Sequence, residues 1–82
     1  MSETVEKKIE DIIRRNLPLF KYREELNLRS DLNMDSLDAI EFLFEIETEM
    51  NIKIPEKHID EEGLLILGNL HRYIEKRLMN PI

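Results

Sequence analysis

The sequence contains no cysteine, no internal repeat, no low-complexity tract and no apolar run of membrane-spanning length. Without cysteine the chain forms no disulfide, no thiolate metal site and no cysteine nucleophile, so any thiol chemistry has to come from an attached group. The first residues, Met1 to Thr4, lack the basic and apolar segments of a signal peptide. We therefore expect a cytoplasmic protein that does not enter a membrane.

The chain has 82 residues, which is enough for one small domain over residues 1–82. A chain of this size has no room for a second core or for the large pocket that most enzymes need. The length therefore favours a binding or carrier module, expected to be a monomer, over an enzyme.

The negative charge is concentrated in one part of the chain. The formal net charge is −6, but residues 31–62 hold eleven acids and two lysines, a net charge of −9, whereas the remainder has ten basic and seven acidic residues, a net charge of +3. Such a field repels nucleic acid and attracts basic surfaces of protein partners. We expect protein partners and no nucleic acid.

Apolar side chains at helical spacing predict a first helix over about residues 3–16, capped by Ser2 and ended by Pro18. Its apolar positions are Val5, Ile9, Ile12, Ile13 and Leu17. Residues 17–34 show no sustained period and predict a long structured loop. The side chains expected to pin this loop are Leu19, Phe20, Leu26, Leu28 and Leu32.

Three further helices are predicted after the loop. The longest runs from about Ser36 to Met50, a short one follows Pro55 over residues 56–60, and Gly63 breaks the chain after it. The last helix spans about residues 67–78 and Pro81 prevents its continuation. The buried positions predicted for these helices are Ala39, Phe42, Leu43, Ile46, Met50, Leu67, Leu70, Tyr73, Ile74 and Leu78. The predicted fold class is all-α, a small up-down bundle of three long helices plus one short helix, with the long structured loop between the first and second helices.

Ser36 stands where the loop turns into the second helix, directly after Asp35, which fits an N-cap. A hydroxyl in the first turn of a helix faces unpaired backbone N–H groups and the positive end of the helix dipole, so a phosphodiester formed there is electrostatically favoured. The alternative is a serine that only hydrogen-bonds the local backbone.

Asp35-Ser36-Leu37 at the start of an acidic helix, followed by Ile54-Pro55, resembles the acyl carrier protein family over nearly the whole chain. The resemblance implies a bundle of the same kind. It also implies that Ser36 receives 4'-phosphopantetheine from coenzyme A, with Asp35 and Leu37 beside it, and that the arm's thiol carries acyl groups as thioesters for fatty-acid, lipid or polyketide enzymes. In this reading the chain is no enzyme, and catalysis belongs to its partners.

The second helix is the expected contact surface for a phosphopantetheinyl transferase and for acyl-processing enzymes. Acidic side chains on its exposed side would meet Arg and Lys, and an exposed apolar centre inside an acidic rim is typical of a transient docking site. The alternative is a solvated face that keeps the protein soluble. The predicted contact residues are Asp35, Leu37, Asp38, Ile40, Glu41, Phe44 and Glu45.

The interior is the expected place for the acyl cargo, because carriers of the fatty-acid type shelter the chain between helices. Ordinary core packing is the alternative for the same side chains. Phe42 stands where the family often has a smaller aliphatic residue, so it is expected to restrict long chains. The residues predicted to line the cavity are Leu28, Phe42, Leu43, Ile46, Ile54, Ile59, Leu70 and Ile74.

Two departures from the family pattern are local. Asn33 stands where glycine is most frequent, and Asn tolerates the left-handed backbone that the turn needs. Ile66 replaces the usual Thr or Ser cap in the apolar segment 64–67, which is either a partner contact or a closure of the bundle.

Three other functions share features with this sequence. An aminoacyl or peptidyl carrier shares the attachment serine, and a plain docking module would never be modified. Asp31, Asn33 and Asp35 match three ligand positions of a calcium-binding EF-hand, but Ser36 and Phe42 occupy positions that need glycine and glutamate. His58 and His71 are isolated from each other and are predicted to lie on the surface. No metal site is predicted.

Overall fold

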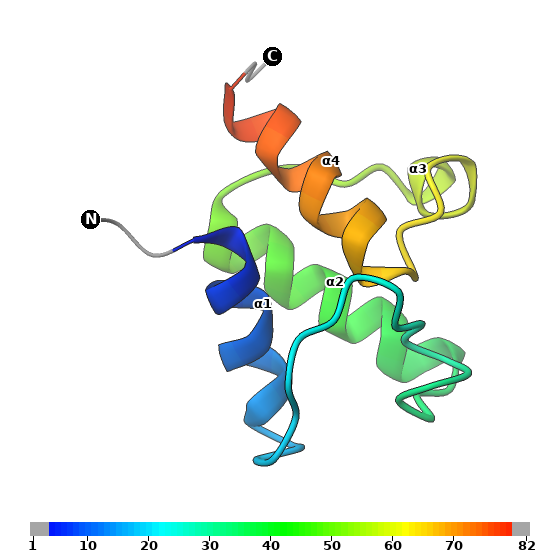
Figure 1. Ribbon diagram of the computed structural model, residues 1–82. Coiled ribbons are helices and arrows are strands. Elements are labelled where there is room, and N and C mark those ends of the chain that lie inside the picture. Colours follow the sequence, from blue (N-terminus) through cyan, green and yellow to red (C-terminus); the bar gives the residue numbers. More distant parts are fainter. Residues whose placement is uncertain (1–3, 80–82) are drawn as a thin grey trace.

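The structure is a computed structural model that describes residues 4–79. Within this range the chain forms four helices and no strand (Figure 1). They are α1 (Val5–Arg14), α2 (Ser36–Met50), α3 (Glu56–Glu61) and α4 (Leu67–Met79). The all-α prediction is confirmed, and α2 has the predicted bounds.

Local side chains explain where the first two helices begin. The Thr4 hydroxyl accepts a hydrogen bond from the Lys7 N–H at 3.1 Å, so Thr4 is the N-cap of α1; Ser2, the predicted cap, lies outside the described residues. Asp35 caps α2 as predicted, because its carboxylate accepts from the Asp38 N–H at 2.8 Å.

Left-handed residues end two of the helices. Asn51 ends α2 with φ 56°, and the N–H groups of Asn51 and Ile52 both donate to the Glu47 carbonyl. Gly63 follows α3 with φ +62°, where a Cβ would also lie 2.9 Å from the Asn69 side chain, so a break at Gly63 is confirmed. Pro81, the predicted stop for α4, lies outside the described residues.

The core lies where α1 packs against both α2 and α4. The predicted apolar faces of α1, α2 and α4 supply most of it. The buried side chains are Ile9, Ile12, Ile13, Phe20, Leu28, Ala39, Phe42, Leu43, Ile46, Ile54, Leu64, Leu67, Leu70, Tyr73 and Ile74. Val5 and Met50 are half-buried at its edge.

Three core predictions were wrong. Helix α1 ends at Arg14 because the Arg15 N–H bonds the Ile12 carbonyl in a tighter turn, so Leu17 falls outside the helix and is 40% exposed. Leu19, at 91% exposed, does not pin the loop. Leu78 on α4 is 48% exposed, since the bundle no longer covers that end of the helix.

The loop between α1 and α2 runs along the bundle and is fixed to the segment before α4 (Figure 1). Asn27 and Ile66 form an antiparallel bridge, the Leu28 N–H donates to the Leu65 carbonyl at 2.8 Å, and the Leu67 N–H donates to the Leu26 carbonyl at 2.9 Å. Gly68 continues this contact, because its N–H bonds the Glu24 carbonyl at 2.8 Å and a Cβ there would clash with Glu24. The apolar segment 64–67 therefore closes the bundle.

Candidate functional site

Ser36 is the first residue of α2 and its side chain is exposed. The loop before it is tightly held: Asn33 has φ 57°, the left-handed conformation expected for it, and the Met34 N–H donates to the Leu28 carbonyl at 3.1 Å. Asp35, the next residue after this turn, is the N-cap of α2. The hydroxyl is thus presented at a fixed place, at the positive end of a helix of 15 residues.

The apolar residues predicted at the docking surface are accessible to different degrees. Leu37 is 65% exposed and Phe44 is 60% exposed, so the partial exposure expected for Phe44 is found. Ile40 is half-buried between them and the core. Large exposed apolar side chains on one helix form the kind of patch that partners cover.

The acidic side chains of α2 are not equivalent. Asp38 and Glu41 are exposed, whereas Glu45 pairs with Arg15 of α1 at 2.9 Å and Glu49 pairs with the same guanidinium at 3.1 Å. These contacts, first the hydrogen bond that Arg15 donates to Glu49, raise the pKa of Arg15. Because solvent reaches both ion pairs, each contributes little binding energy. A basic partner can therefore compete with Arg15 for Glu45.

Glu47 has a structural role that the sequence did not indicate. Its carboxylate accepts a hydrogen bond from the Ile54 N–H at 2.6 Å and so ties the end of α2 to the segment before α3. An acid spaced seven residues before an Ile-Pro is the signal that could have suggested this contact.

The residues predicted to line one cavity separate in the structure. A pocket of about 80 Å³ between α2 and α3 is lined by Leu43, Ile54 and Ile59 of the predicted set. Ile40 and Phe44, predicted as docking residues, line it too, together with Glu47 and Glu56. Of the remaining predicted residues, four lie deeper in the core: Leu28, Ile46, Leu70 and Ile74.

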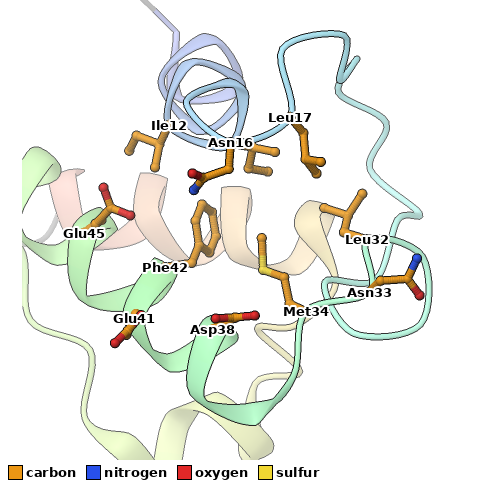
Figure 2. Close-up of a pocket in the computed structure, with 11 residues that line it drawn as sticks. Ile12, Asn16, Leu17, Leu32, Asn33, Met34, Asp38, Glu41, Phe42 and Glu45 are labelled. Carbon is orange, nitrogen blue, oxygen red and sulfur yellow. The ribbon is translucent and has the colours of Figure 1, made fainter.

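Phe42 points to a different hollow, of about 340 Å³, between the end of α1, the loop and α2. Figure 2 shows Phe42 and Met34 pointing into this hollow toward α1. Asp38, Glu41 and Glu45 also line it, so it is apolar at the floor and acidic at the edge.

Both histidines are half-buried at the surface, and each has side-chain contacts that the sequence analysis did not predict. His58 Nδ1 of α3 lies 2.7 Å from the Tyr73 hydroxyl of α4, and Arg77 donates to that hydroxyl at 3.0 Å. His71 Nε2 lies 3.1 Å from the Glu75 carboxylate. Periodicity could not reveal the contact between His58 and Tyr73, because it joins different helices. The pairing of His71 with Glu75 follows the i,i+4 spacing of one helix, and this spacing is the signal that could have suggested it.

The side chains that matched a calcium loop are engaged by the backbone. The Asp31 carboxylate accepts from the Asn27 N–H at 2.8 Å and the Asp35 carboxylate caps α2. In an EF-hand these oxygens converge on the ion. Among residues 4–79 no three acidic or histidine side chains gather as a metal site would require.

The geometry fits the attachment of a phosphate ester. Ser36 is exposed, the turn before it is fixed, and the N-terminus of α2 offers backbone N–H groups to a phosphate. The profile of the family described as "Phosphopantetheine attachment site" matches residues 4–63, which include the whole of α2. The chain belongs to this family.

Curated relatives named "Acyl carrier protein" cover most of the chain. The protein of Porphyromonas gingivalis strain ATCC 33277 is 36% identical over 80 residues, 95% of this chain and 99% of its own length. That of Buchnera aphidicola subsp. Baizongia pistaciae is 37% identical over 76 residues, 90% and 95% of the two chains. That of Thermotoga maritima is 32% identical over 78 residues, 93% and 94% of the two chains.

These matches confirm the acyl carrier family and its covalently attached 4'-phosphopantetheine. Members of the family are carriers, with acyl groups as cargo and biosynthetic enzymes as partners. Within residues 4–79 of this carrier, no helix has the length and apolar character needed to cross a membrane.

Proposed function

We propose that Ser36 holds the phosphopantetheine arm of this carrier and that α2 presents it to partner enzymes. The observation that carries the proposal is an exposed serine hydroxyl on the first residue of a capped helix, inside the matched segment. Once attached, the arm supplies a thiol that holds acyl groups as thioesters. The chain's own residues supply position and recognition: Asp35 fixes the helix start and Leu37 stands exposed beside the attachment point.

Intact mass tests the attachment directly. The purified protein is incubated with coenzyme A, magnesium and a broad-specificity phosphopantetheinyl transferase, beside Ser36→Ala and Ser30→Ala. Ser30 is a matched control, because it is also exposed and stands in the loop just before α2. Wild type and Ser30→Ala should gain one phosphopantetheinyl group and Ser36→Ala none. A gain by Ser36→Ala, or none by folded wild type, would contradict the proposal.

The proposed partner surface combines Asp38 and Glu41 with Leu37 and Phe44. All four side chains are exposed on α2, next to the proposed attachment point. Basic residues on the transferase and on acyl-processing enzymes would pair with the carboxylates while the apolar side chains are covered. Glu45 belongs to this surface when a partner displaces Arg15, and Asp35 and Ile40 lie at its margin.

For the cargo we propose that a short acyl segment enters the pocket between α2 and α3. The pocket's volume of about 80 Å³ is roughly half that of an apolar cavity of about 150 Å³ that holds one benzene molecule. Leu28, Ile46, Leu70 and Ile74 fill the space beyond it. A longer chain therefore has to displace core side chains, and Ile59, which lines the pocket from α3, is the place to test this.

The cargo test compares thioester hydrolysis for acyl chains of increasing length on wild type, Ile59→Ala and Phe42→Leu. If the α2–α3 pocket shelters the chain, Ile59→Ala should protect longer chains. Phe42→Leu should protect longer chains only if the acyl chain reaches the hollow between the end of α1, the loop and α2. Equal hydrolysis rates in all three proteins at every length would exclude shelter by either space.

A further inference from the structure

A broad, shallow hollow, largely open to solvent, lies on the surface beside the start of α2. It extends from Asp35, the neighbour of Ser36, over Met34 and Asn33 to Leu65 and to Arg29 in the loop. Met34 and Leu65 are half-buried and give it an apolar floor. The hollow is thus adjacent to the proposed attachment point, on the loop side of the helix.

Arg29 is the basic residue of this hollow, and its side chain is exposed. Each of the other five arginines contacts a carboxylate, hydroxyl or carbonyl oxygen. Within residues 4–79, the Arg29 guanidinium makes no ion pair or hydrogen bond. An exposed, unpaired guanidinium beside an acidic helix is free to bind an anion.

The backbone under Arg29 is held in place. The Asn27 side-chain oxygen accepts from the N–H groups of Arg29 at 2.8 Å and Ser30 at 3.1 Å. Asn27 is itself fixed by Asp31 and by its bridge to Ile66. The position of Arg29 relative to the start of α2 is therefore set by the fold, and only its side chain has to move.

We propose that Arg29 pairs with the phosphodiester of the arm and that the first part of the arm lies in this hollow against Met34 and Leu65. The inference rests on the proposed attachment at Ser36. A phosphodiester is an anion beside Asp35 and Asp38, whose carboxylates repel it. A guanidinium binds phosphate oxygens through two parallel N–H donors and so offsets this repulsion, together with the N–H groups of the helix end.

The test compares amide spectra of ¹⁵N-labelled protein before and after loading, for wild type, Arg29→Ala and Arg23→Ala. Arg23 is a matched control, since it is exposed in the same loop, pairs with Glu25 at 3.8 Å and lies outside the hollow. Intact mass verifies loading in each sample. In wild type and the control, loading should shift the amides of Arg29, Ser30 and Leu65 as well as those around Ser36.

In Arg29→Ala the shifts at Ser30 and Leu65 should disappear while those around Ser36 remain, and the phosphodiester ³¹P resonance should move. Arg29→Lys should restore part of the effect, because it keeps the charge without the two parallel donors. Shifts confined to the neighbours of Ser36 in loaded wild type would overturn the inference and leave the attachment intact. Absence of any mass gain would instead overturn the attachment on which it rests.

Discussion

Tyr22, in the loop between α1 and α2, is partly buried, and its burial makes the stability of the fold depend on pH. Its hydroxyl donates to the Leu67 carbonyl at 3.3 Å, and its ring meets His71 edge-on with the centroids 6.2 Å apart. Burial, followed by the charge of Glu6, raises its pKa from 10.0 to about 12. Below the ordinary value Tyr22 is protonated in both the folded and the unfolded chain.

Between these two pKa values the unfolded chain releases the tyrosine proton while the folded chain keeps it, so stability falls as pH rises. We expect Tyr22→Phe to lose less stability than wild type between about pH 10 and pH 12. Urea midpoints measured across this range for both proteins check the difference. Parallel curves for the two proteins would show that Tyr22 does not contribute to alkaline unfolding.

Asp35 combines an N-cap with a negative charge beside the proposed attachment point, and two substitutions separate these roles. Asp35→Ala removes the acceptor for the Asp38 N–H and should reduce the free energy of unfolding by about 1 kcal/mol. Asp35→Asn keeps an acceptor and should cost only a few tenths of a kcal/mol. Chemical denaturation measures both values. If loading by the transferase slows equally in the two variants, the lost charge is the cause.

At the scale of a helix, α4 has a buried part and an exposed end. Ile74 has no exposed surface, whereas Leu78, one turn further on the same helix, is 48% exposed. Ile74→Ala should reduce the free energy of unfolding by about 2–5 kcal/mol, because it removes packed methyl groups and leaves a cavity. Leu78→Ala should change it by about 0.5 kcal/mol or less. Denaturant midpoints for the two variants check this, and comparable losses would contradict the observed end of the core.

Between α1 and α2, Arg15 pairs with Glu49 and with Glu45, one of the acids predicted to contact partners. Its side chain is half exposed, so the pairs are screened by salt and exchange with solvent. The consequence concerns recognition more than stability: on the proposed partner surface, Asp38 and Glu41 are exposed and do not share the Arg15 guanidinium.

At the scale of the whole molecule, the negative field of residues 31–62 surrounds the proposed attachment point. Glu41→Lys should slow loading by a basic transferase about twofold to tenfold at low salt, because it places a like charge at the contact. Glu75→Lys on α4 makes the same change in net charge and should have little effect. Initial loading rates at several salt concentrations measure both. Equal rates for Glu41→Lys and wild type at low salt would argue against an acidic docking surface.

The sequence by itself determined the order of the four helices described in residues 4–79 and indicated the family with its attached 4'-phosphopantetheine. Periodicity gave α2 its bounds, since an apolar stripe at helical spacing has to face a core. Asp35 before Ser36 specified a capped helix start, because this depends on neighbouring residues only. Asn33 and Gly63 marked the turns, since few residues tolerate left-handed backbone.

Only the tertiary structure decided which side chains meet across elements. It moved Leu17, Leu19 and Leu78 out of the core, because burial depends on what covers a residue and periodicity does not report that. The packing of helices that are distant in sequence also decides two contacts, Arg15 with Glu45 and His58 with Tyr73. It likewise decides which of the residues predicted to line one cavity surround the pocket between α2 and α3. The position of Arg29 beside the start of α2 is decided in the same way, by the bridge that ties the loop to the segment before α4.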